Sequence, residues 1–244
     1  MSRYWLNTTE KDPVVFQQQS DTVCGVYAAA PQAQEAGEHT LSTDEMTGIQ
    51  ALERAAPTKP LRPGQVEKRE FEYIRHGTQA LIANLDVATG QIVTPSVGAT
   101  RTEADFVAHI AQTIATDPDA KWTFVLDQLN THQSESLVRL VAHRCQLPDD
   151  LGVKDKSGIL KSMPSRAAFL SDPTHRIRFV YTPKHSSWLN QIEIWFSTLV
   201  RRLLKRGSFT SVEDLRQRLL DFIAFFNRTA KPYKWTYKGR PLQA

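Results

Sequence analysis

The sequence predicts an α/β protein that is built on a mixed β-sheet. Short β-prone runs come first and include a hairpin, and later runs alternate with segments of helical periodicity. The run Trp122–Leu126 is short and almost unbroken in apolar character, which is typical of a central strand that is covered on both faces. The chain has 244 residues, of which 41% are hydrophobic, so it can bury a core of this kind.

The predicted strands are short and are bounded by turn-forming residues. Residues 46–69, rich in Pro, Arg and Lys, are predicted to be a surface excursion. The strands are expected at 39–44, at 71–74 and 79–85 as a hairpin turning through His76-Gly77, at 91–94, at 122–126 and at 177–181.

Four later segments have the 3.6-residue periodicity of amphipathic helices. The longest, 185–206, carries Trp, Leu, Ile and Phe on one broad face, with Ser186 or Ser187 as a possible N-cap and Gly207 as a stop. Glu193 lies at the border of that face. Its carboxylate either binds a cation or reaches solvent, and the helix alone favours neither interpretation. The other three helices are expected at 102–116, 134–145 and 211–226, with Thr102 as the N-cap of the first and Ser211 as the N-cap of the last.

Charge is distributed unevenly along the chain. Residues 181–244 carry 12 Lys and Arg against 4 Asp and Glu, whereas residues 1–180 carry 18 against 22. A basic C-terminal quarter is typical of a protein that binds a polyanion, although a solvated basic helix face would have the same composition.

Several classes of protein are disfavoured. No run approaches the ~20 apolar residues of a membrane span, and the N-terminus lacks the apolar segment of a secretory signal. The two cysteines, Cys24 and Cys145, have no metal-binding or redox spacing. The motifs GxxxxGK[ST], HExxH and GxGxxG are absent. The expected protein is soluble, cytoplasmic and not membrane-bound.

Three carboxylates, all far apart in the sequence, are candidates for a shared site. Asp44 and Asp127 each end a predicted strand, and Glu193 lies on the helix that follows the last strand. If the strands at 39–44 and 122–126 are neighbours, Asp44 and Asp127 face one crevice at the edge of the sheet. Three acids in one place repel one another unless cations neutralise them, and oxygen ligands suit Mg²⁺ or Mn²⁺. Two such ions can act on both oxygens of a phosphoryl displacement.

Four stretches carry a resemblance to a known family. They are STDEMTGIQALE around Asp44, EFEYIRHGT at 70–78, FVLDQLNTH around Asp127, and RIRFVYTPKHSSWLNQIEIWFSTLVRRLLKRGSF around Glu193. Together they resemble the catalytic half of bacterial insertion-sequence transposases of the Tc/mariner superfamily of DDE enzymes. The resemblance covers essentially the whole chain, and its last block is long and specific.

The resemblance implies a ribonuclease H-like fold, with a mixed five-stranded sheet and helices on both faces. It implies cut-and-paste DNA transposition by Asp44, Asp127 and Glu193, which hold two Mg²⁺ or Mn²⁺ ions, in a protein that acts as a homodimer on element ends and target DNA near the bacterial nucleoid. Glu45 is the rival of Asp44 as the first ligand. His132 matches a histidine that the family often keeps near the metals, and a helix cap or surface group is the alternative for it. Asn190 and Ser187 are expected to support the Glu193 helix.

The resemblance also suggests a division of the chain and a DNA-binding surface. Residues 1–38 are expected to be a helical linker or brace, 39–228 the catalytic domain with an insertion at 148–176, and 229–244 a basic, aromatic tail. Trp235 and Tyr237 could stack on an unpaired base, although packing within the protein is the favoured use. The expected DNA-binding residues are Arg201, Arg202, Lys205, Arg206, Lys154, Lys156, Lys161, Lys234 and Lys238.

The chain departs from the family pattern in two respects. The family commonly places Asn after the second Asp, where this chain has Gln128. Nothing before residue 39 has the length of two helix-turn-helix modules, so the chain is interpreted as a catalytic domain alone. A nuclease or resolvase that cuts without strand transfer, and a non-catalytic DNA-binding remnant, remain alternatives.

Overall fold

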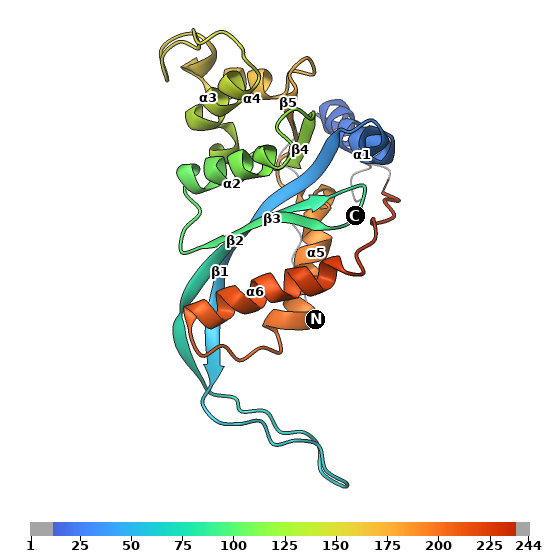
Figure 1. The fold of residues 1–244 in the computed structure, drawn as a ribbon, viewed down its shortest axis with the longest axis vertical. Coiled ribbons are helices and arrows are strands. Elements are labelled where there is room, and N and C mark those ends of the chain that lie inside the picture. The colour runs from blue at the N-terminus through green and yellow to red at the C-terminus, as the bar shows by residue number, and fades with distance from the viewer. Residues whose placement is uncertain (1–11, 238–244) are drawn as a thin grey trace.

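The structure is a computed structural model that describes residues 12–237. Its centre is one five-stranded sheet in the order β3-β2-β1-β4-β5 (Figure 1). Strand β1 pairs antiparallel with β2 and parallel with β4; β3 is antiparallel to β2, and β5 is parallel to β4. The predicted mixed sheet is therefore confirmed. The strands are β1 (His39–Arg54), β2 (Tyr73–Asp86), β3 (Ile92–Gly98), β4 (Trp122–Leu126) and β5 (Ile177–Tyr181).

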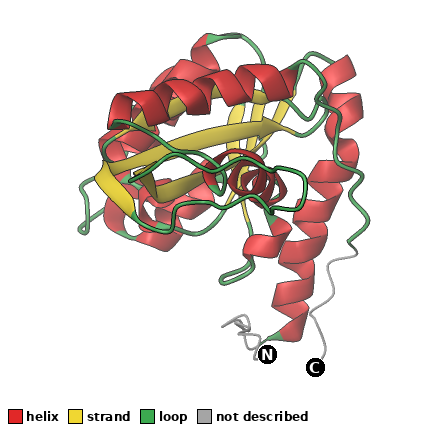
Figure 2. Cartoon of the chain, turned by 90° about the horizontal axis from the view of Figure 1, so that it is seen from below, coloured by secondary structure: helices red, strands yellow, loops and turns green. Residues whose placement is uncertain are grey.

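Helices cover both faces of the sheet, as predicted (Figure 2). Because successive side chains of a strand point to opposite faces, Ile82 packs with one group of helices while Leu81 and Ala83 pack with the other. The first group is α2 (Glu103–Ala115), α3 (Glu135–Arg144) and α4 (Met163–Leu170). The second group is α1 (Pro13–Glu35), α5 (Ile192–Leu199) and α6 (Val212–Asn227).

The hairpin of the fold differs from the predicted one. Residues 71–74 and 79–85 do not form two strands, because β2 runs continuously through Gly77, whose φ is +127°. The pairing of β1 with β2 shifts register next to this glycine, between Gln50↔Thr78 and Leu52↔Arg75. A β-bulge explains why a glycine that resembles a turn lies inside a strand.

Strand β1 is also much longer than predicted. It does not end at Asp44, since it continues to Arg54 and pairs with β2 as far as Tyr73. Residues 54–73, here called the arm, then extend from the body of the protein (Figure 1). Within the arm, backbone bridges join Lys59 to Lys68 and Arg62 to Gln65. The first part of the predicted surface excursion, residues 46–54, is therefore strand. The polar composition of residues 46–69 did not indicate a strand, because only Ile49 and Ala51 of these residues are buried.

The segment 148–176 differs from the polar insertion that the sequence suggested. It contains α4 and a short 3₁₀ turn, η2 (Ile159–Lys161). Leu151, Leu160 and Leu170 are buried in the same core cluster as α2 and α3. Arg166 is buried too, and its guanidinium donates to the carbonyl oxygens of Gln133 and Leu160. The segment therefore completes one face of the sheet.

The N-terminal helix and the C-terminal tail pack against each other. Helix α1 starts after Asp12, which accepts a hydrogen bond from Val14 N, and it continues through Pro31 instead of breaking there. One side of α1, including Tyr27, is buried against the sheet, and Trp235 of the tail packs on the same cluster. Within the part of 1–38 that the structure describes, α1 therefore lies against the sheet and the tail.

The predicted helix 185–206 is three elements. A 3₁₀ turn, η3 (Ser187–Leu189), comes first; Asn190 is extended, with φ −86° and ψ 110°, and α5 follows from Ile192. A π-helical turn, η4 (Val200–Leu204), closes the segment. Ser186 and Ser187 therefore do not cap α5. The caps predicted for two other helices are confirmed, since Thr102 caps α2 and Ser211 caps α6.

Candidate active site

The parallel pairing of β1 and β4 brings two of the predicted acids to the same edge of the sheet. The pairing ends at Ser42↔Val125. Asp44 lies two residues beyond this pair, inside β1, and Asp127 directly follows the last residue of β4. Asp44 is thus at the end of the β1–β4 pairing and not at the end of its strand. Glu193 is the second residue of α5, which packs on the same sheet.

The electrostatics of these carboxylates show that the three groups are near one another. Burial, followed by the charges of Asp127 and Glu193, raises the pKa of Asp44 to about 7. Burial and the charge of Asp127 also raise the pKa of Glu193. The three acids are therefore electrostatically coupled, since the charge of Asp127 opposes ionisation of the other two.

A buried imidazole joins Asp127 to Glu45. Nδ1 of His132 lies 2.8 Å from Oδ1 of Asp127, and Nε2 lies 3.3 Å from Oε1 of Glu45. The ring packs on Phe106, with 4.4 Å between ring centroids, and Tyr181 donates a hydrogen bond to the carbonyl oxygen of His132. His132 is therefore a buried member of the site.

The two neighbouring carboxylates set the protonation state of His132. Burial alone would lower its pKa, but the hydrogen bonds and charges of Asp127 and Glu45 outweigh this and raise it to about 10. Burial likewise opposes ionisation of Asp127, yet the hydrogen bond and charge of His132 lower the pKa of that carboxyl. His132 is consequently an imidazolium that donates to both acids.

Asp44 and Glu45 point to opposite faces of β1. On one face, Ser42 contacts Asn190 at the start of α5, and Asp44 follows two residues later. On the other face, Thr43 contacts Asn84, and Glu45 follows and meets His132. The Glu45 side chain is 3% exposed. The pleat thus directs Asp44 toward the helix that carries Glu193.

Asn190 holds Asp44 in place. Its Nδ2 donates to Oδ2 of Asp44 at 3.2 Å and to the carbonyl oxygen of Thr43 at 3.0 Å. Its Oδ1 accepts from the Ser42 hydroxyl, whose oxygen in turn accepts from Ile192 N at 2.9 Å. Sequence reasoning missed this contact, because it assumed that Asn190 lay within a helix. The signal available was an Asn, a common helix-flanking residue, directly before the apolar run.

The donor chemistry of the site suits a hard divalent cation. Within residues 12–237, no three His, Cys, Asp or Glu side chains are gathered closely enough to ligate one ion as they lie. Carboxylate oxygens are nevertheless the ligands that Mg²⁺ and Mn²⁺ prefer. The raised pKa values of Asp44 and Glu193 reflect negative charge that such a cation would neutralise. The three acids therefore fit the metal in charge and donor type.

The predicted basic residues lie in different parts of the molecule. Arg201, Arg202 and Arg206 line one hollow of about 510 Å³ together with Thr198, on the continuation of the helix that carries Glu193. Lys205 is exposed in the same turn. Three further lysines, on segment 148–176, lie beside the helices of the opposite face. These are Lys154, Lys156 and Lys161; Lys234 is exposed in the tail, and Lys238 lies outside the described residues.

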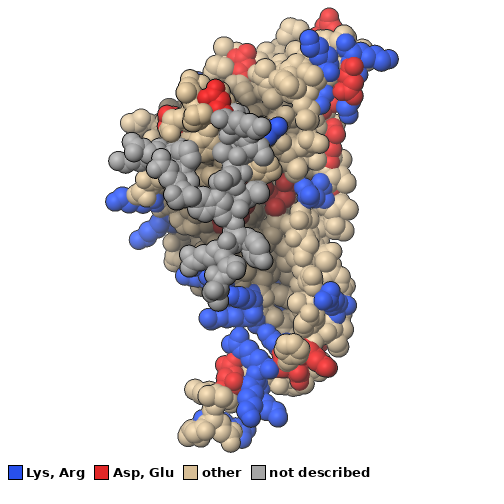
Figure 3. All heavy atoms as spheres, turned by 180° about the vertical axis from the view of Figure 1, so that it is seen from behind, with Lys and Arg blue, Asp and Glu red and all other residues tan. Residues whose placement is uncertain are grey.

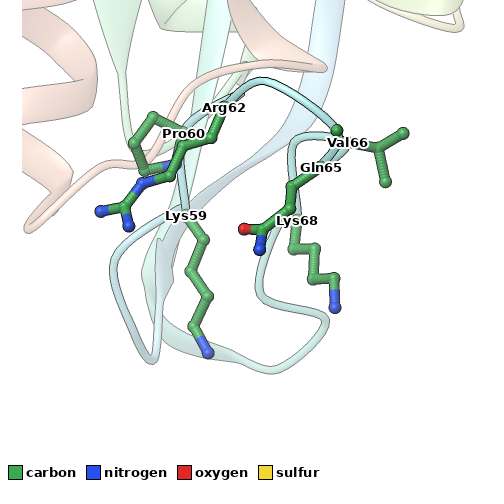
Figure 4. Close-up of a pocket in the computed structure, with 7 residues that line it drawn as sticks. Lys59, Pro60, Arg62, Gln65, Val66 and Lys68 are labelled. Atoms are coloured by element: carbon green, nitrogen blue, oxygen red, sulfur yellow. The ribbon is translucent and has the colours of Figure 1, made fainter.

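The arm is a second basic feature, and sequence reasoning did not assign it to DNA. Figure 3 shows lysines and arginines gathered on the arm and on the surface above it. Lys59, Arg62 and Lys68 line a hollow of about 650 Å³, and the side chains of Lys59 and Lys68 extend in the same direction (Figure 4). Phe71 is 90% exposed on the same arm.

Gln128 replaces the family's usual Asn without facing the acids. Its Nε2 donates to the carbonyl oxygen of Thr182 at 2.9 Å, which joins the loop after β4 to the end of β5. The side-chain amide of Gln128 therefore holds together two backbone segments next to the site.

The chain was compared with protein families and with curated protein sequences. A profile of the family described as DDE superfamily endonuclease matches residues 39–216. A comparison with curated protein sequences finds no significant match.

Solved structures of mariner transposases share the fold. The Mos1 mariner paired-end complex with Mn superposes with a TM-score of 0.54 at 11% identity and covers 92% of this chain and 60% of that chain. The catalytic domain of Mos1 mariner transposase gives 0.51 at 9% identity, covering 90% and 85%. These likenesses confirm the expected ribonuclease H-like fold. The chain spans about 60% of the length of the transposase in the paired-end complex.

Proposed function

Because this chain belongs to the DDE superfamily endonucleases, we propose that it is the catalytic part of a Tc/mariner-type transposase. It cuts DNA with divalent metal and transfers the freed 3′ end to a target. The observation that supports this best is the electrostatic coupling of Asp44, Asp127 and Glu193 at one edge of the sheet. The family match supports the same reaction class.

Asp44, Asp127 and Glu193 would hold two Mg²⁺ or Mn²⁺ ions. Bound there, the cations supply electrostatic stabilisation of the attacking and leaving oxygens of a phosphodiester. Asp44 is the first ligand in this proposal, since Glu45 is already held by His132. A mariner paired-end complex of like fold contains Mn, which supports the choice of metal.

The remaining residues of the site position these acids. His132 keeps Asp127 ionised and fixes one of its oxygens through the hydrogen bond from Nδ1. Asn190 fixes one oxygen of Asp44. Oδ1 of Asp44 also accepts from Glu45 N at 2.8 Å, and Oδ1 of Asp127 accepts from Leu129 N at 3.0 Å, so both acids are oriented before any ligand binds.

DNA is the proposed partner. One mariner relative of like fold is a paired-end complex with a transposon end, and another is a strand transfer complex. The hollow lined by Arg201, Arg202 and Arg206 offers three guanidinium groups to backbone phosphates. A homodimer on two DNA ends is part of the proposal. Lys205, Lys154, Lys156, Lys161, Lys234 and Lys238 are further proposed DNA contacts.

The test uses supercoiled plasmid with Mn²⁺, because the element's own ends are unidentified. The wild-type chain should nick the plasmid, and Asp127→Asn should not. A labelled oligonucleotide with a free 3′-OH should also become joined to the plasmid. Nicking without joining would favour an endonuclease or resolvase. Equal nicking by wild type and Asp127→Asn would contradict the enzyme and favour a non-catalytic DNA-binding protein.

A further inference from the structure

Helix α1 contributes a buried hydroxyl to the chain segment that precedes α5. The side chain of Tyr27 is 3% exposed, and its hydroxyl donates to the carbonyl oxygen of Leu189 at 3.0 Å. The hydroxyl oxygen of Tyr27 in turn accepts a hydrogen bond from Gln191 N at 3.3 Å. Tyr27 therefore holds the backbone on both sides of Asn190, and its partner Leu189 is 162 residues away in the sequence.

The side chain of Asn190 connects this part of the backbone to the acids. Its Nδ2 donates to Asp44, and its Oδ1 accepts from Ser42, whose hydroxyl oxygen accepts from the first residue of α5. Glu193 is the next residue of that helix. A continuous set of buried hydrogen bonds thus runs from Tyr27 to Asp44 and to the start of the helix that carries Glu193.

Tyr27 itself has a fixed position. It packs with Val23 and Ala30 of α1 and with Val125 of β4. Trp235 lies against its ring, edge to face, with 5.1 Å between centroids. Burial raises the pKa of the Tyr27 hydroxyl, so it stays protonated and keeps its role as a donor. A buried, satisfied network of this kind restricts the groups that it joins.

We infer that Tyr27 is a positioning residue for the catalytic carboxylates, acting through Asn190. This rests on the proposed function. Helix α1 precedes residues 39–216, which the family profile matches, so in this inference a helix outside the matched range completes the site. The competing interpretation is that Tyr27 only stabilises the packing of α1.

A conservative variant and a matched control separate the two interpretations. Tyr27→Phe removes the hydroxyl and keeps the ring. Val23→Ala removes fully buried side-chain volume from the same cluster and removes no hydrogen bond of the network. Melting temperature reports stability for both, and the Mn²⁺ concentration for half-maximal plasmid nicking reports the site.

Tyr27→Phe should raise the Mn²⁺ concentration for half-maximal nicking about tenfold, the lower end of the effect of removing partners that orient metal ligands. Val23→Ala should lower the melting temperature and leave the Mn²⁺ requirement unchanged. In an Asn190→Ala background, Tyr27→Phe should add no further shift, because both act through one chain of contacts.

An unchanged Mn²⁺ requirement in Tyr27→Phe would overturn the inference, as would an equal shift in Val23→Ala or an additive effect in the Asn190→Ala background. If the wild type fails to nick, the proposed function fails. Mn²⁺ affinity measured by EPR then decides the inference, with about tenfold weaker binding by Tyr27→Phe supporting it and equal binding overturning it. Absence of Mn²⁺ binding by the wild type would overturn both ideas.

Discussion

Nδ1 of His132 lies 2.8 Å from Oδ1 of Asp127, in a place where the His132 side chain has no exposure to solvent. The other ring nitrogen faces Glu45, which is almost as deeply buried. One imidazolium thus balances two carboxylates, and only Asp127 is among the proposed metal ligands. This arrangement links the orientation of Asp127 to the stability of the core.

His132→Ala should lower the free energy of unfolding by about 3 kcal/mol, because it leaves Glu45 as a buried charge without its partner. Urea unfolding at pH 7 measures the change. His143→Ala, at an exposed histidine of α3, is the matched control and should change stability little. A loss below about 1 kcal/mol in His132→Ala would contradict the buried ion pair.

Asp44→Asn should stabilise the metal-free protein at pH 8. The pKa of Asp44 is about 7 in the folded state against an ordinary value of 3.8. Between these values the folded state keeps a proton that the unfolded state has released, so wild-type stability falls as pH rises from about 4 to 7. Each pKa unit corresponds to about 1.4 kcal/mol, which predicts a gain of several kcal/mol at pH 8 and almost none at pH 4.

Urea unfolding in EDTA at both pH values measures this gain. Asp221→Asn, at an exposed carboxylate of α6, is the control and should show no such pH dependence. Equal gains in stability at pH 4 and pH 8 in Asp44→Asn would show that ionisation of Asp44 does not cause the fall in wild-type stability with rising pH.

Mn²⁺ should raise the melting temperature of the wild type, since a ligand that binds only the folded state stabilises it by about 2.7 kcal/mol at 100 times its Kd. Asp127→Asn removes one of the three proposed carboxylate ligands and should lose most of this gain. Differential scanning fluorimetry with and without MnCl₂ measures the effect. Equal shifts in both proteins would place Mn²⁺ elsewhere.

Replacing Arg201, Arg202 and Arg206 together with Gln should weaken binding to a random-sequence duplex and flatten its salt dependence. Each phosphate contact contributes about −0.9 to the slope of log K against log salt, so three lost contacts should reduce its steepness by about 2.7. Fluorescence anisotropy across a salt series measures this. Arg216→Gln, which removes an exposed ion pair of α6, is the control and should leave the slope unchanged.

Trp235→Ala should destabilise the protein and leave single-strand binding almost intact. The indole packs on Tyr27 and its Nε1 donates to Sγ of Cys24, so its surface is engaged within the chain. A loss of about 1–3 kcal/mol in urea unfolding is expected. Loss of oligo-dT affinity without loss of stability would favour stacking on a base instead.

Features that depend on local sequence patterns could be predicted from the sequence. The unbroken apolar run of β4 indicated a central strand, and the caps Thr102 and Ser211 were visible as polar residues before periodic segments. The neighbouring positions of β1 and β4 followed from the assumption that two strand-associated acids share a site, and the register confirms the pairing.

The failures have a common physical cause, since each depends on contacts made far away in the sequence. Asn190 leaves helical conformation because Ser42 and Asp44 bind its side chain. Residues 45–54 remain a strand because β2 pairs with them. Leu151 and Leu160 lie in a polar segment and are buried only because α2 and α3 provide a surface for them. Periodicity within a short window contains none of this information.

The long β1–β2 hairpin has a consequence for the handling of the protein. Its tip offers Lys68 and Arg69 to trypsin in exposed backbone that few hydrogen bonds secure. Limited digestion should therefore cut there first and yield two fragments. The fragments should elute together from a sizing column, because β1 and β2 remain side by side in the central sheet on either side of the nick.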